Sequence, residues 1–279
     1  MPEIEVNGIS LSYDDTGHGP AVILVHGNVA SARWWQKVTP LLSDRFRVIV
    51  PDLRGFGRSE KPGTGYAIAQ YAADLEAMAD ALGLAGLGGS LAGGPVGGGV
   101  GGPGSRARGA HWVGHSLGGS VILQVALDRP DLVHSLTLID PGPAEGLQTP
   151  ADRIPLLVAT AQNRDWMKMA LAGIAATAPK DDYFEALVDD GMAAGGVLVP
   201  NALDLNQWNV QARLGEIRVP TLIVMGEKDP LVPLDAVKRT ATGITGSRLE
   251  VIQGVTHSPP IESPDALLHL MVPFLDTVS

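Results

Sequence analysis

The chain has 279 residues, a formal net charge of -10 and no cysteine. The absence of cysteine excludes disulfides, thiolate catalysis and cysteine-ligated metal sites. The acidic balance provides no basic surface for phosphate backbones or anionic lipid, so neither a nucleic-acid nor a membrane partner is expected. The first residues, MPEIEVNG, lack the apolar core of a signal peptide, so a cytoplasmic protein is expected.

Short apolar runs closed by turn residues predict buried strands. The opening residues 3–15 alternate between polar and apolar side chains, which predicts an antiparallel hairpin at a sheet edge. Further strands are predicted at 21–27, 46–52, 110–115, 135–140, 221–226 and 249–254. Helical patterns lie between most of them, among them 69–83, 119–130 and 263–278. This alternation predicts an α/β fold with a mostly parallel central sheet flanked by helices.

Residues 86–109 interrupt the alternation with twelve glycines in twenty-four positions. Such a segment loses much backbone entropy on ordering and buries little surface, so a flexible insertion within the core domain is predicted. Its first nineteen residues are uncharged, but the glycines and two prolines are incompatible with a transmembrane helix.

Residues 142–213 form a second interruption, rich in alanine and methionine and without strand signals. The pattern predicts a small helical lid inserted after the sixth strand. The core domain would then consist of residues 1–141 and 214–279. Extra helical packing on the core is the alternative interpretation of the same stretch.

Ser116 lies between Gly114 and Gly118, directly after the strand 110–115 and before a helix. Glycine is so common in this chain that the Gly-x-Ser-x-Gly spacing alone is weak evidence. The strand–turn–helix context is stronger, because it holds a serine on a strained turn with its hydroxyl exposed. We therefore predict that Ser116 is a nucleophile.

A serine nucleophile needs a base, and the base needs an acid that orients it. Asp229 follows the strand 221–226, and His257 follows the strand 249–254. The chain order serine, aspartate, histidine is that of the serine hydrolases with this motif. We predict His257 as base and Asp229 as acid, with Asp140 at the end of the strand 135–140 as the alternative acid.

The negative oxygen formed during attack on a carbonyl also needs hydrogen-bond donors. We predict the backbone N–H of Asn28, after His26-Gly27, and that of Leu117 at a helix N-terminus. Candidate residues of the substrate pocket are Trp34, Trp35, His115, Leu156, Met167 and Met169. Packing onto the core is the alternative role for the five of these side chains other than His115.

Five motifs in order resemble those of the α/β-hydrolase superfamily: HGN, PDLRGFGRS, GHSLGG, VPTLIVMGEKDPLVP and GVTHSPPIESP. The resemblance covers nearly the whole chain outside residues 86–109 and implies the α/β-hydrolase fold. Dehalogenases and epoxide hydrolases of this fold would need aspartate at position 116. The HGGPG motif of proline iminopeptidases and the GPGA loop of C–C bond hydrolases are also missing. Serine esterases and lactonases remain most similar.

The resemblance implies a hydrolase that cleaves small to medium carboxylic esters through an acyl-enzyme, without a metal or an organic cofactor. A lactonase, for example for acyl-homoserine lactones, and a cofactor-free perhydrolase are alternatives within enzymes. A ligand receptor that retains a hydrolase triad is the alternative from another class. The sequence carries no signal for an oligomeric state.

Overall fold

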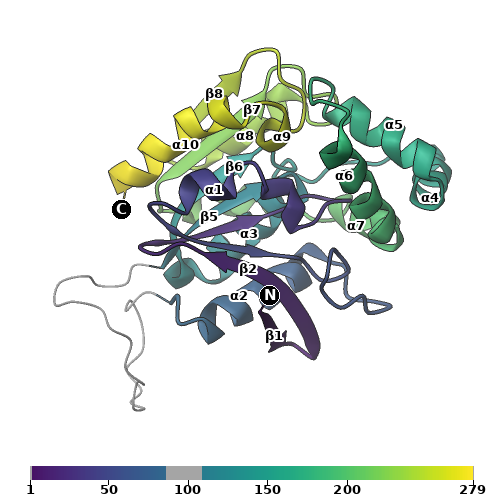
Figure 1. The fold of residues 1–279 in the computed structure, drawn as a ribbon. Coiled ribbons are helices and arrows are strands. Elements are labelled where there is room, and N and C mark those ends of the chain that lie inside the picture. The colour runs from purple at the N-terminus through teal and green to yellow at the C-terminus, as the bar shows by residue number, and fades with distance from the viewer. Residues whose placement is uncertain (1, 86–108, 279) are drawn as a thin grey trace.

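A computed structural model describes residues 2–85 and 109–278, and the prediction of a flexible insertion lies almost entirely outside them. Within these residues the core is one eight-stranded sheet (Figure 1). Its strands are β1 (Glu3–Val6), β2 (Ile9–Thr16), β3 (Ala21–Val25), β4 (Arg47–Pro51), β5 (Ala110–His115), β6 (Val133–Ile139), β7 (Thr221–Gly226) and β8 (Arg248–Ile252).

The strand order is β1-β2-β4-β3-β5-β6-β7-β8. Strand β2 is antiparallel to both β1 and β4, and every other pair is parallel. The hairpin turn is Asn7-Gly8, with φ of 48° and 77°, the left-handed pair that a tight two-residue hairpin favours. The predicted mostly parallel sheet and its edge hairpin are confirmed. The carboxyl ends of β3 to β8 consequently share one edge, where sites of α/β sheets form.

Helices cover both faces of the sheet (Figure 1). Apolar side chains of α2, α3 and α8 form one buried cluster with the sheet, and those of α1 and α10 belong to a second. All but one of the residues of helix α3 are buried, so protein encloses this helix on nearly every side. The bounds are α1 (Thr39–Leu42), α2 (Ile68–Ala81), α3 (Leu117–Asp128), α8 (Leu234–Gly243), α9 (Pro259–Glu262) and α10 (Pro264–Val278).

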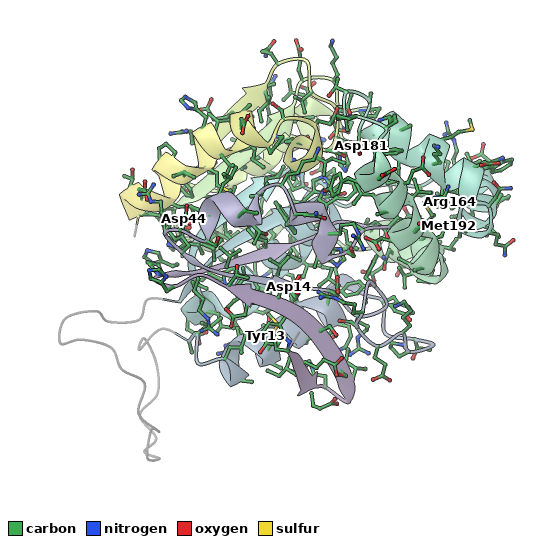
Figure 2. All side chains as sticks on the ribbon, in the orientation of Figure 1. Tyr13, Asp14, Asp44, Arg164, Asp181 and Met192 are labelled. Atoms are coloured by element: carbon green, nitrogen blue, oxygen red, sulfur yellow. The ribbon has the colours of Figure 1, made fainter. Side chains whose placement is uncertain are left out.

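The chain between β6 and β7 is helical, which confirms the predicted insertion after the sixth strand. Its main helices are α4 (Ile154–Gln162), α5 (Arg164–Ile174), α6 (Asp182–Ala193) and α7 (Leu198–Leu205). Figure 1 shows them together beyond one end of the sheet. Arg164, labelled in Figure 2, joins α5 to α6 through ion pairs with Glu185 and Asp189. The lid role and the domain boundaries at 142 and 213 stay predictions.

Among the four main helices of this insertion, which we call the lid, α4 is the least buried. Of its nine residues only Thr160 is buried, although most of the helix is apolar. The Leu156 side chain is 46 % exposed, and Val158 is 40 % exposed. Among the described residues, no helix has both the length and the apolar character needed to cross a lipid bilayer.

Candidate active site

Ser116 occupies a strained turn between β5 and α3, with φ 54° and ψ -120°. Two glycines make this turn sterically possible. A Cβ on Gly114 would lie 2.4 Å from the Gly118 carbonyl oxygen, and a Cβ on Gly118 would lie 2.4 Å from the Val25 carbonyl oxygen. No side chain fits at either distance, so both residues must be glycine if strand and helix are to approach this closely.

The strain at Ser116 is part of a local pattern. Apart from Asn7 in the hairpin, the described non-glycine residues with positive φ are Val29 (51°), Ser116 (54°) and Asp140 (41°). They follow β3, β5 and β6, which are neighbours in the sheet. Each such conformation costs on the order of 1–3 kcal/mol and persists only where the surroundings enforce it. The sheet edge predicted to carry the chemistry is therefore also where backbone strain concentrates.

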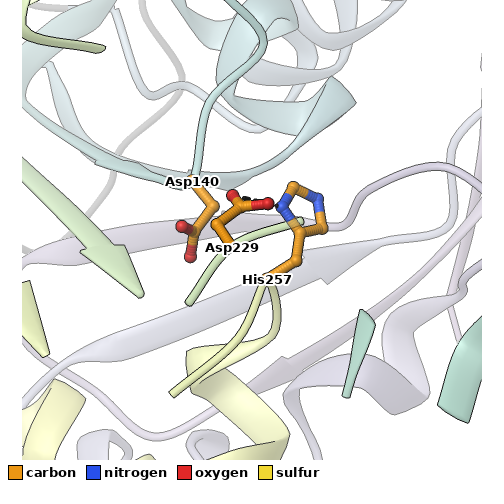
Figure 3. A group of neighbouring side chains, drawn as sticks. All are labelled: Asp140, Asp229 and His257. Carbon is orange, nitrogen blue, oxygen red and sulfur yellow. Dashed lines mark hydrogen bonds and ion pairs between the residues drawn. The ribbon is translucent and has the colours of Figure 1, made fainter. Parts of the chain in front are cut away.

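His257 and Asp229 meet directly at this edge (Figure 3). The Nδ1–H of His257 donates to Asp229 Oδ2 over 2.7 Å. Asp229 Oδ1 accepts from the backbone N–H groups of Leu231 and Val232. Burial opposes ionisation of this carboxyl, but these three donors hold the pKa of Asp229 below its ordinary value. A carboxylate that binds Nδ1–H leaves Nε2 of His257 free to accept a proton.

His115, the residue before Ser116, contacts His257 directly. The Nε2–H of His115 donates to the His257 carbonyl oxygen over 2.7 Å, and the two ring centroids are 5.0 Å apart. Burial and the nearby His257 lower the pKa of His115 to about 3, so its ring is neutral. Trp34 stacks on the other side, with 5.2 Å between centroids. No hydrogen bond joins Ser116 and His257 in the described part of the chain; such bonds commonly tighten only when substrate binds.

Glu262, at the end of α9, is a supporting residue that the sequence analysis did not identify. Its Oε1 accepts from the Thr256 N–H, the Thr256 hydroxyl and the Ser258 N–H, so it binds the chain on both sides of His257. Its Oε2 accepts from the N–H and hydroxyl of Thr177. One carboxylate thus folds the histidine loop and ties it to the lid. The local sequence PPIE, residues 259–262, gives no indication of this role.

Asp140, the alternative acid, lies beside Asp229 but does not contact the imidazole by hydrogen bond (Figure 3). It is fully buried, and its Oδ1 accepts from the Gly226 N–H over 2.9 Å. Burial, together with the charge of Asp229, raises the pKa of Asp140 well above its ordinary value. Asp229 is therefore the carboxylate that orients His257 in this structure, and Asp140 is a buried carboxyl beside it whose pKa is raised.

The three groups Asp140, Asp229 and His257 offer atoms that all lie within 4.8 Å of one another, a spacing that could hold a metal ion. Two observations argue against a metal there. Both oxygens of Asp229 are already hydrogen-bonded, and burial together with the Asp229 charge raises the pKa of Asp140, whereas metal ligands must be deprotonated.

The predicted oxyanion donors follow β3 and β5. Gly27 packs against the nucleophile, since a Cβ there would lie 3.0 Å from Ser116 Cβ. His26 accepts the Leu53 N–H at Nε2 and donates from Nδ1 to the Gly27 carbonyl. The N–H of Asn28 points opposite to that carbonyl, because the peptide is trans. Neither this N–H nor that of Leu117 donates to another described residue.

The six pocket candidates divide into two groups. Trp34, Trp35, Met167 and His115 are buried, and the first three belong to the cluster that packs α10 and the lid on the sheet. Leu156 and Met169 lie at the surface, and the Met169 side chain is 71 % exposed. That exposure leaves Met169 with little contact to the core in this structure. The assignment of these six residues to a substrate pocket stays a prediction.

Comparison with known proteins adds a family match. The profile described as the alpha/beta hydrolase family matches residues 22–270. The 2-(acetamidomethylene)succinate hydrolase of Mesorhizobium japonicum is 29 % identical, over 98 % of this chain and 94 % of that protein. A 2-hydroxy-6-oxo-6-phenylhexa-2,4-dienoate hydrolase of Burkholderia cepacia is 26 % identical, over 97 % and 92 %.

Among solved structures, Est816, an N-acyl homoserine lactone degrading enzyme, is 27 % identical with a TM-score of 0.77. It aligns with 98 % of this chain and 100 % of its own. The esterase EaEST of Exiguobacterium antarcticum has a TM-score of 0.81 at 23 % identity, over 97 % of both chains. At that identity the second likeness concerns the fold alone.

Proposed function

The chain belongs to the alpha/beta hydrolase family, and from this premise we propose that it is a serine hydrolase of small to medium carboxylic esters. The observation that carries the proposal is the 2.7 Å hydrogen bond between His257 and Asp229, next to a serine on a strained turn. A base oriented by a carboxylate near a serine hydroxyl is the arrangement that acyl transfer requires.

The reaction would proceed through an acyl-enzyme. Nε2 of His257 removes the Ser116 proton while Oγ attacks the ester carbonyl, and the N–H groups of Asn28 and Leu117 stabilise the resulting oxyanion. His257 then gives the proton to the leaving alcohol. A water molecule, deprotonated by the same imidazole, attacks the acyl-enzyme, and collapse of the second tetrahedral intermediate releases the acid and restores Ser116. Asp229 stabilises the imidazolium at both stages.

A lactone is the second candidate substrate. It is favoured by the likeness to Est816, which extends over nearly the full length of both chains at 27 % identity. Lactones need no different machinery, because opening the ring breaks the same acyl–oxygen bond. The relatives named for dienoate and succinate substrates make those compounds useful members of a test panel.

The test measures steady-state hydrolysis of p-nitrophenyl acetate, butyrate and octanoate, and of acyl-homoserine lactones by pH-stat. Ser116→Ala should reduce kcat by at least about 10⁴-fold. Ser120→Ala is the matched control: Ser120 is fully buried four residues later, and its hydroxyl has no partner among the described residues. It should keep wild-type turnover.

Three outcomes would contradict the proposal. Turnover retained in Ser116→Ala would show that Ser116 is not the nucleophile. Wild-type turnover confined to the dienoate would show that esters are not the substrate class. A single stoichiometric burst without further turnover would favour a receptor that retains hydrolase residues.

A further inference from the structure

We propose that Asn201, on lid helix α7, is a positioning residue that holds the oxyanion loop, residues 26–32, in its working conformation. The inference rests on the proposed function, because it assigns a role to a loop that matters only if an oxyanion forms. It places one determinant of catalysis in the lid, about eighty residues from the nucleophile in sequence.

The contact is direct and buried. Asn201 Nδ2 donates to Asn28 Oδ1 over 2.9 Å, and Tyr71 of α2 donates its hydroxyl hydrogen to Asn201 Oδ1 over 2.8 Å. Asn201 is 1 % exposed and Tyr71 is fully buried. Buried amides are retained where both ends find partners, and here both ends of Asn201 do. The side chain therefore bridges the core helix α2 and the loop after β3.

The direction of these hydrogen bonds follows from one backbone group. The Val29 N–H donates to the same Asn28 Oδ1 over 3.2 Å. Since a backbone N–H can only donate, the atom it meets is the Asn28 oxygen and not the amide nitrogen. Asn201 must then present its nitrogen to Asn28 and its oxygen to Tyr71. The orientations of both asparagine amides are thus fixed, and Asn201 cannot flip its amide without losing both hydrogen bonds.

The loop needs such support because Val29 is strained. A β-branched residue at φ 51° is an outlier that only its surroundings can maintain. Asn28 Oδ1 accepts the Val29 N–H, and the same oxygen accepts from Asn201 Nδ2, which fixes its position. If Asn201 releases Asn28, the peptides at 28 and 29 lose a restraint, and the Asn28 N–H is no longer held beside Ser116.

A displaced oxyanion donor affects the transition state more than the ground state. Removal of the Asn201 amide should therefore lower kcat and leave KM nearly unchanged. It should also weaken 1-butaneboronic acid, which forms a tetrahedral adduct with a serine nucleophile, more than butyramide, which resembles the substrate.

The experiment measures p-nitrophenyl butyrate kinetics and both inhibition constants for wild type and four variants. Asn201→Leu removes both hydrogen bonds at similar volume. Asn201→Asp keeps an acceptor for Tyr71 but turns a carboxylate oxygen towards Asn28 Oδ1. Tyr71→Phe leaves Asn201 in place without its anchor. Gln207→Leu, exposed in the same insertion, is the matched control, and circular dichroism compares folding throughout.

Asn201→Leu and Asn201→Asp are expected to lower kcat and boronic acid affinity about 10- to 100-fold, with KM and butyramide affinity within about threefold. Tyr71→Phe should give a smaller loss of the same kind, and Gln207→Leu none. The inference is overturned if both Asn201 variants fold and keep kcat and boronic acid affinity within twofold of wild type. It is also overturned if butyramide affinity falls as far as boronic acid affinity. A wild type that neither turns over ester or lactone nor binds the boronic acid contradicts the proposed function, and this inference fails with it.

Discussion

The histidine side of the candidate site takes the direct restraints on His257 from the core, whereas the oxyanion side takes two of its restraints from the lid. His257 is bound at Nδ1 by Asp229, at its carbonyl by His115 and on both flanking residues by Glu262. These residues come from the strand ends and from α9. The oxyanion loop instead takes restraints from the lid, through Asn28 to Asn201 and through Ser31 to Asp190 of α6.

The difference separates two requirements of acyl transfer. Orientation of the base is enforced directly by Asp229 and His115 of the core, so it should resist changes in the lid better than the oxyanion loop does, although Glu262 also binds Thr177 of the lid. Placement of the oxyanion donor depends on Asn201 and Asp190 of the lid helices α7 and α6, so it should respond to substitutions there. Substitutions on the two sides are consequently expected to change different kinetic quantities.

The largest effect is expected on the histidine side, from Asp229→Asn. The amide would present a donor or a weaker acceptor to Nδ1 and favour the wrong imidazole tautomer, so kcat should fall about 10³- to 10⁴-fold with KM little changed. Stopped-flow or steady-state ester hydrolysis measures this. Asp140→Asn is the control one carboxyl away, and an equal loss in both variants would show that the two acids act as one unit.

Glu262→Gln tests the support behind the histidine. The glutamine oxygen can still accept from part of the set formed by Thr256 and Ser258, but without charge, and hydrogen bonds to charged groups contribute about 1.5–3 kcal/mol. We expect a loss of about 1–2 kcal/mol in the free energy of unfolding and a roughly tenfold lower kcat. Urea denaturation and ester kinetics provide the two numbers. A variant with wild-type values for both quantities would show that the Glu262 charge does not support the histidine loop.

On the oxyanion side, Asp190→Asn weakens a second lid contact without touching Asn28. Asp190 Oδ2 accepts from the Ser31 hydroxyl over 2.6 Å and from Arg33 Nε over 2.8 Å. The Arg33 side chain is 44 % exposed, so the ion pair itself contributes little. We expect kcat to fall about two- to fivefold through partial loosening of the loop. A larger loss of kcat than in Asn201→Leu would show that the main restraint on the oxyanion loop comes from α6 and not from α7.

The smallest kinetic effect is expected from Asp140→Asn, whose consequence is a change in pH dependence. The pKa of Asp140 is raised in the folded protein above the ordinary value of 3.8. The folded state therefore binds the proton more tightly, and its contribution to stability is complete below about pH 3.8 and lost as pH rises towards the raised pKa. Relative to wild type, Asp140→Asn should gain stability as pH rises above about 4. Thermal unfolding from pH 4 to 9 measures this, and parallel curves would contradict it.

The sheet and the acid–histidine contact were predictable from sequence because each depends on local signals. Apolar runs mark the strands, and parallel strands send their carboxyl ends to one edge, so Asp229 and His257 could be expected there together. Asn201 and Glu262 carry no such signal. Their partners lie at Asn28 and Thr256, and a hydrogen bond between residues far apart depends on how helices pack after the sheet has formed.

The pocket candidates show a second limit. Helical periodicity identifies Met167 and Met169 as apolar residues of one helix, but not the direction that each faces. The structure buries the first and exposes the second. Which face of a lid helix meets the core is decided by neighbouring helices, and these packing partners cannot be derived from the pattern of one segment.

The strained backbone at Val29, Ser116 and Asp140 implies a conflict between thermal stability and catalytic activity. Glycine would accept each of these conformations without penalty, so a chain with glycine at 116 should outlast wild type on heating while doing no chemistry at all. Selection of variants for heat resistance alone would therefore favour substitutions that inactivate the site, unless turnover is selected at the same time. Stabilising substitutions are better sought away from this edge of the sheet, where stability and catalysis do not compete.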